Sequence, residues 1–170
     1  SSPAATQMRY RLKPGVPADR LEFDDLPHAQ FALDSYGVFS KLKDEGVLPK
    51  ACRLQVDFAG VISVMRRFIV PEEQQAVGAA YERGLAGQVR KMLQVIPEHE
   101  LAIQWDVASA VFQHLEESTP TPYGKTREEM MESFSTWHAK LGDDIPAGVD
   151  LLYHLCYGDQ GHRHSIEPAT

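Results

Sequence analysis

The chain has 170 residues, of which 43% are hydrophobic and 24% are charged, and its formal net charge is −7. This composition is typical of one globular domain with a core of its own, and it excludes disorder of the whole chain. Lysine and arginine are scattered along the sequence, so the charge pattern gives no support for binding nucleic acid or an anionic membrane.

The two cysteines, Cys52 and Cys156, are too few for a disulfide framework and are compatible with a reducing compartment. No apolar run approaches the roughly 20 residues that cross a bilayer, and the N-terminus lacks the charged-then-apolar order of a signal peptide. We therefore expect a soluble, cytoplasmic protein without nucleic-acid or membrane partners.

Residues 1–24 contain three prolines and little periodicity, which predicts an extended N-terminal arm before a domain at 25–170. Within the domain, apolar residues at three- and four-residue steps indicate helices, and alternating or continuous apolar runs indicate strands. We expect helices at 25–46, 71–96, 108–117 and 126–142, and strands at 52–58, 101–107 and 149–157. The run 61–70 suits a short helix or a loop, and the tail 158–170 is expected to be a loop.

Local signals place several of these boundaries. Asp24 or Asp25 can cap the first helix and Gly46 can end it. Thr126 and Glu129 have the spacing of a capping box at the start of the last helix.

Helices that alternate with apolar strands predict parallel strands, buried on both sides and joined by right-handed crossovers. In such folds the chemistry gathers at the carboxyl ends of the strands. The expected strands end near Asp57, near Asp106 and in the segment 154–159. We therefore expect one site at this rim.

The last strand carries the densest group of potential metal ligands. His154 and Cys156 should point to the same side because side chains alternate along a strand. Imidazole and thiolate both suit zinc, and His162 and His164 repeat the spacing and could supply further ligands. The alternative is that Cys156 is a buried small residue and His154 a hydrogen-bonded core histidine; Cys52 is expected to be structural.

Asp106 follows Trp105 at the end of an apolar strand, where an isolated carboxylate is costly unless it has a partner. It can act as a general acid or base, bind a substrate amine, or cap the following helix, and Asp57 allows the same interpretations. The sequence contains neither a glycine-rich phosphate loop nor a Gly-x-Ser-x-Gly elbow, so nucleotide binding and serine hydrolysis receive no support.

Two motifs carry a family resemblance: LAIQWDVA at 101–108, and YHLCYGD at 153–159 with Gly161-His162, His164 and Glu167-Pro168 after it. They resemble uncharacterised relatives of the C-terminal, zinc-binding barrel of cobalamin-independent methionine synthase, in the methionine synthase/uroporphyrinogen decarboxylase-like superfamily. The resemblance extends from about Arg11 onward. It implies an α/β fold of the (β/α)8-barrel type with parallel strands, incomplete here because a whole barrel takes about 250 residues.

The resemblance also implies a zinc-dependent, thiol-activating methyltransferase of the 5-methyltetrahydrofolate–homocysteine type, with a small thiol or amino-acid-like substrate. His154 and Cys156 match a His-x-Cys pair of zinc ligands, and a Glu and a second Cys follow on later strands in the relatives. Asp106 matches a substrate-binding carboxylate, although Val107 replaces the neighbouring Glu, and Asp159 is a second catalytic candidate. Further residues are expected to line the site, namely His162, His164, Trp105, Tyr157 and Asp57.

Two other functions remain open. A non-catalytic α/β module could pair with a second copy or with a completing segment, because an open sheet edge exposes unpaired backbone groups. A lyase or decarboxylase could use the carboxylates and histidines without metal, because fold does not fix function.

Overall fold

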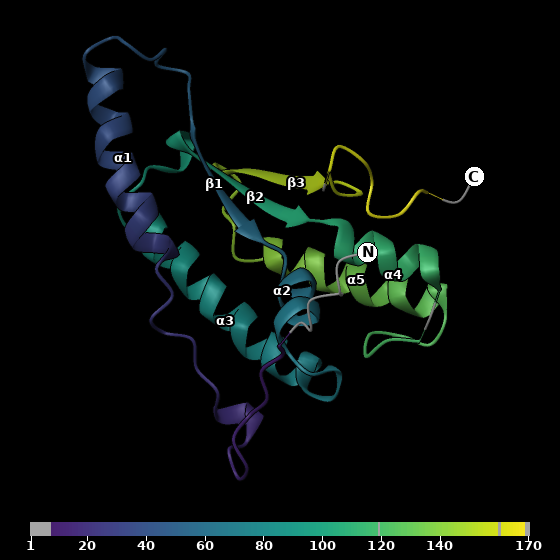
Figure 1. Cartoon of the computed structure of the whole chain (residues 1–170). Helices are drawn as coiled ribbons and strands as arrows, with labels where there is room; N and C mark the ends of the chain where they lie inside the picture. Colours follow the sequence, from purple (N-terminus) through teal and green to yellow (C-terminus); the bar gives the residue numbers. More distant parts are fainter. Residues whose placement is uncertain (1–7, 119, 160, 169–170) are drawn as a thin grey trace.

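The computed structural model describes residues 8–118, 120–159 and 161–168. Three parallel strands form one open sheet in the order β1-β2-β3, with helices between them (Figure 1). In chain order the elements are α1 (His28–Asp44), β1 (Leu54–Ala59), α2 (Val61–Phe68), α3 (Gln74–Leu93), β2 (Leu101–Val107), α4 (Ser109–Glu117), α5 (Arg127–Gly142) and β3 (Asp150–Leu155). The α/β class and the parallel pairing are confirmed.

Most predicted elements are present, and the differences at their ends have local causes. The run after β1 is the short helix α2, which buries Val61, Ile62 and Met65. Helix α1 begins at His28, and its N-cap is Pro27 instead of an aspartate, since proline fits the first turn without needing an N–H partner. A short 3-10 helix, Pro71–Glu73, precedes α3.

Helix α5 begins where the capping-box spacing predicts. The Thr126 hydroxyl accepts a hydrogen bond from the Glu129 N–H at 3.2 Å. The Glu129 carboxylate in turn accepts a hydrogen bond from the N–H of Lys125 at 2.7 Å, one residue before the cap. Two backbone N–H groups at the start of α5 therefore have side-chain acceptors.

The core lies on one face of the sheet, which the helices cover (Figure 1). Phe58 of β1 and Trp105 of β2 are adjacent in the register, and their rings stack at 4.9 Å between centroids. Both side chains are almost completely buried. Burial of such large aromatic side chains is the main stabilising contribution at the sheet centre.

The other face of the sheet is largely open to solvent. On it the register aligns Asp57 with Gln104 and Leu152, and the next row aligns Asp106 with His154. Strand β1 alternates between exposed and less exposed residues, and all six residues of β3 are exposed. The prediction of strands buried on both sides is therefore wrong for β1 and β3. In the described chain no second layer covers this face, and on the face toward the helices Leu151, Tyr153 and Leu155 of the edge strand β3 are exposed as well.

The described part of the N-terminal arm runs beside α2. The N–H of Tyr10 donates to the carbonyl of Phe68 at 2.6 Å, and the N–H of Val70 donates to the carbonyl of Tyr10 at 3.1 Å. Leu12 and Phe23 pack against the core. The short 3-10 helix Ala18–Arg20 is the regular element in the described part of this segment.

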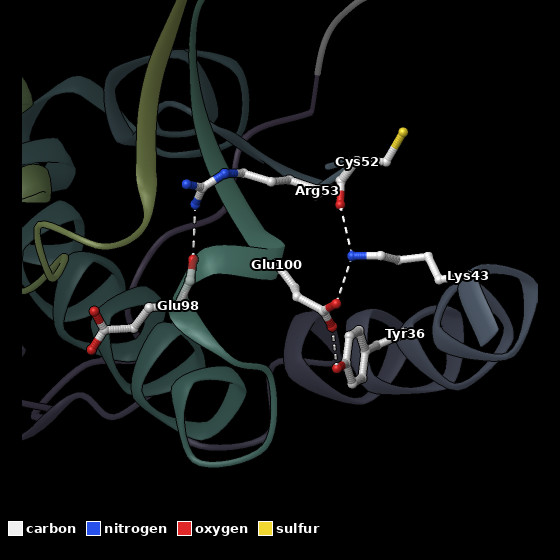
Figure 2. A network of polar contacts seen from close by, with 6 residues as sticks. All are labelled: Tyr36, Lys43, Cys52, Arg53, Glu98 and Glu100. Carbon is white, nitrogen blue, oxygen red and sulfur yellow. Dashed lines mark hydrogen bonds and ion pairs between the residues drawn. The ribbon is translucent and has the colours of Figure 1, made fainter. Parts of the chain in front are cut away.

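A polar network joins α1 to the amino end of β2 (Figure 2). The Lys43 ammonium is 2.5 Å from one Glu100 oxygen and donates to the Cys52 carbonyl at 3.1 Å. Tyr36 donates to the other Glu100 oxygen at 2.6 Å. Both hydrogen bonds lower the pKa of Glu100, and the bond from Lys43 has the larger effect.

Arg53 extends this network to β3. Its guanidinium donates to the carbonyls of Glu98, Leu101 and Gly148 at 2.7–3.2 Å, and it pairs with Asp150 at 3.0 Å. This end of the sheet lies opposite the expected site, and in α/β folds residues there serve mainly stability. None of the helices in the described part of the chain combines the length and apolar character that a membrane span requires.

Candidate metal centre

Three potential metal ligands converge at the carboxyl ends of β2 and β3: Asp106, His154 and Cys156. Asp106 and His154 are partners in the β2–β3 register and lie on the uncovered face. Cys156 follows the end of β3, two residues beyond His154. One oxygen, one nitrogen and one sulfur atom of these side chains all lie within 4.8 Å of one another.

The carboxylate of Asp106 has an unsatisfied oxygen. Its Oδ1 is buried and has no hydrogen-bond partner among the described residues. Nε2 of His154 lies 3.9 Å from that atom, which is too far for a hydrogen bond. Because a buried charged oxygen without a partner is costly, a cation between these groups would stabilise the arrangement.

The donor set and spacing fit zinc. Carboxylate oxygen, imidazole nitrogen and thiolate sulfur are the three ligand types that zinc uses in proteins. A tetrahedral ion would hold such atoms roughly 3.3–3.6 Å apart, given bond lengths of about 2.0–2.3 Å. In the structure the three ligand atoms lie within 4.8 Å of one another, which is slightly farther apart than a bound ion would hold them. The side chains of His154 and Asp106 are 49% and 38% exposed, so they have room to move closer together, and solvent can reach the site.

Two alternative interpretations of these residues are wrong. Ala108, and not Asp106, is the N-cap of α4, and no side chain caps that end in the described chain. His154 is exposed, so it is not a core histidine. Cys156 is partly buried and carries a free thiol.

Among the described residues, the later histidines His162 and His164 and also Asp159 are not members of the three-ligand group. His164 instead pairs with Glu167 at 3.1 Å, and its ring centroid is 5.8 Å from that of Tyr157. Asp159 and His162 are exposed. The structure therefore offers a ligand set drawn from two strands, and not the local cluster that the sequence spacing allows.

The remaining candidate residues have other neighbours. Trp105 lies on the opposite face, in the core. The Tyr157 hydroxyl donates to Glu116 at 2.9 Å, and its ring stacks on Phe112 at 4.6 Å, which anchors the segment after β3 to α4. Asp57 lies on the uncovered face and accepts a bond from Gln55 at 2.9 Å.

The sequence predicts Asp106 at the same edge of the sheet as His154 and Cys156, but as a substrate-binding carboxylate and not as a metal ligand. The missing information is the strand register, since the two motifs are almost fifty residues apart in the sequence. Comparisons with protein-family models, with curated proteins and with solved structures gave no match. The chemistry of the site is therefore argued from its own residues.

Proposed function

We propose that Asp106, His154 and Cys156 bind a zinc ion and that the site activates a substrate thiol for methyl transfer. The observation that carries the proposal is the convergence of the three ligand atoms within 4.8 Å, with the buried Asp106 oxygen lacking a partner in the described chain. These side chains come from the carboxyl ends of adjacent parallel strands, where α/β enzymes place their chemistry.

Three protein ligands leave one position open on a tetrahedral ion, which is the pattern of catalytic zinc sites. Zinc bound there would hold a substrate sulfur as thiolate at neutral pH. His154 and Cys156 would fix the ion on the rigid end of β3, while Asp106 would add a negative charge from β2. The exposed side of His154 leaves a path for the substrate.

Methyl transfer is chosen among thiol reactions because the motifs at 101–108 and 153–159 resemble those of the methionine synthase barrel. The same resemblance leads us to propose that the three-stranded sheet is part of a (β/α)8-type barrel. Two features support this: the helices cover one face alone, and polar residues such as Asp57, Gln104 and Asp106 occupy the other. In a barrel the uncovered face would line the interior.

The reaction is tested with cobalt in place of zinc. We expect the cobalt protein to show a thiolate-to-metal charge-transfer band that changes when homocysteine is added, and to transfer a methyl group from 5-methyltetrahydrofolate to that thiol. Cys156→Ser should lose the band, whereas Cys52→Ser, which alters the other free cysteine, should keep it. A cobalt spectrum that does not respond to thiols would contradict the proposed activity.

A second candidate function rests on the edge strand β3. Four of its apolar side chains, Leu151, Leu152, Tyr153 and Leu155, are 37–65% exposed. An apolar strand at a sheet edge favours pairing with another chain, which suits a non-catalytic module completed by a second copy. Sedimentation at increasing protein concentration tests this: self-association that Leu152→Lys abolishes supports the module, and a monomer at all concentrations contradicts it.

A further inference from the structure

A separate cleft of about 410 Å3 lies where the N-terminal arm, α2, the start of α4 and the tail meet. Arginines and serines predominate in its lining: Arg9, Arg66, Arg67, Ser63, Ser109 and Ser165. None of the described residues that line it is acidic, although the chain carries 24 acidic and 17 basic residues. The lining therefore concentrates positive charge and hydrogen-bond donors in an acidic protein.

The backbone holds two of these arginines near each other. The paired backbone of Tyr10 and the end of α2 fixes Arg9 beside α2. Arg66 is partly buried, and its guanidinium donates to the Ala110 carbonyl at 3.0 Å. Burial lowers the pKa of Arg66 and the like charge of Arg9 lowers it further, while Glu117 raises it. A bound anion would relieve the repulsion between the two guanidinium groups.

The first turn of α4 adds to this positive potential. The helix has nine residues, and its N-cap Ala108 supplies no side-chain cap, so the free N–H groups of the first turn favour a negative charge. In addition, the Ser63 hydroxyl is buried without a partner in the described chain.

The tail closes the cleft next to this turn. The N–H of Ser165 donates to the Tyr157 carbonyl at 2.8 Å. A Cβ on Gly158 would lie 2.5 Å from Oγ of Ser165 and 3.2 Å from Cβ of Ser109, so a side chain at this position would displace the two serines. Gly158 also has a φ of +90°, which other residues rarely adopt. The cleft is therefore built from fixed backbone on several sides.

We propose that this cleft binds the phosphate or carboxylate group of a small anionic ligand. Arg9 and Arg66 would neutralise the anion, because guanidinium groups bind such oxygens through paired hydrogen bonds. The hydroxyls of Ser63 and Ser109 would donate to its remaining oxygens. The assignment uses none of the three metal ligands, so it stands independently of the zinc proposal.

The test is a calorimetric titration of the whole protein with inorganic phosphate and, separately, with succinate, at constant ionic strength. We expect saturable binding of one of them with a Kd of about 1 mM or lower. Arg9→Gln and Arg66→Gln should each weaken binding at least tenfold. Arg20→Gln, in the short helix of the arm, is the matched control and should bind as the wild type does.

Arg9→Gln is the decisive variant, because its side chain is exposed whereas Arg66 also supports the Ala110 carbonyl. Saturation by phosphate alone or by succinate alone would support the site and identify its ligand group. Cys156→Ser should keep the affinity, which separates this proposal from the zinc site. Absence of saturable binding to either anion, or equal affinities in the wild type and Arg9→Gln, would overturn it.

Discussion

Gly60 and Asp106 are in direct backbone contact at the carboxyl ends of β1 and β2. The Gly60 N–H donates to the Asp106 carbonyl at 3.0 Å, and a Cβ on Gly60 would lie 2.5 Å from that oxygen. Such a distance cannot be reached without a shift of one backbone. Glycine at position 60 therefore allows this close approach to the backbone of Asp106, whose side chain belongs to the candidate metal centre.

We expect Gly60→Ala to displace Asp106 and to lower the free energy of unfolding by about 1–3 kcal/mol, as overpacking does. Zinc affinity should fall as well, because one of three ligands moves. Gly37→Ala in α1 is the control, since apart from its chain neighbours and the nearby backbone of its own helix no described atom lies within 4 Å of the added Cβ, and it should leave stability equal or up to about 1 kcal/mol higher. Urea unfolding of both variants makes the comparison, and equal stabilities would contradict the prediction.

Lys43→Met should destabilise the amino end of the sheet. The substitution leaves the Glu100 carboxylate partly buried without its cation, so we expect a loss of about 2–3 kcal/mol. Lys41→Met is the matched change, because Lys41 makes an exposed pair with Glu45 at 3.8 Å, and it should cost less than about 0.5 kcal/mol. If the two variants unfold at the same urea concentration, the network does not contribute as proposed.

The same network predicts sensitivity to acid. The pKa of Glu100 is lowered in the folded protein by its bonds from Lys43 and Tyr36, so the unfolded chain binds a proton more readily. The stabilisation is present above the ordinary pKa of 4.5 and is lost as the pH falls below it. Glu100→Gln should flatten the fall in stability below about pH 4.5, relative to Glu45→Gln on the exposed surface; parallel pH profiles would contradict this.

His114 predicts a second loss of stability at a higher pH. The pKa of His114 is lowered from 6.5 to about 4, mainly by burial and also by the nearby charge of Arg66, while Glu117 acts in the opposite direction. Because the unfolded chain takes up the proton first, stability is full above about pH 6.5 and falls toward pH 4, on the order of 3 kcal/mol in total.

His114→Leu should flatten this slope, whereas His99→Gln, at an exposed position, should leave it unchanged. His28 and His138 also have a pKa lowered by burial, so a smaller slope should remain in the variant. Thermal unfolding between pH 4 and pH 7 measures the difference. A slope in His114→Leu as steep as that of the wild type would show that His114 is not buried as a neutral group.

Much of the fold could be predicted because its signals are local. Apolar spacing gave the alternation of helices and strands, and the Thr126–Glu129 pair gave the start of α5. The exposure of β3 could not be predicted, because its sequence is as apolar as that of a central strand. No pattern within the strand shows whether another strand or layer packs beside it.

The candidate site could be predicted in part. The spacing of His154 and Cys156 predicts them as a pair, and the order of helices and strands predicts Asp106 at the same edge of the sheet. That Asp106 joins them as a ligand depends on the strand register, which neither motif encodes. The close contact at Gly60 was missed because that glycine carries no turn signal. The arginine cleft was missed because Arg9, Arg66 and Ser109 are far apart in the sequence, and Arg66-Arg67 inside an apolar run was its single local signal.

The most direct test of the metal centre is the zinc content of the purified protein, followed by competition with a chelator of known affinity. We predict about one zinc ion per chain. Cys156→Ser and Asp106→Asn should each weaken binding at least tenfold, and Cys52→Ser should bind as the wild type does. Negligible zinc in the wild type, or equal zinc affinity in the wild type and Cys156→Ser, would contradict the account.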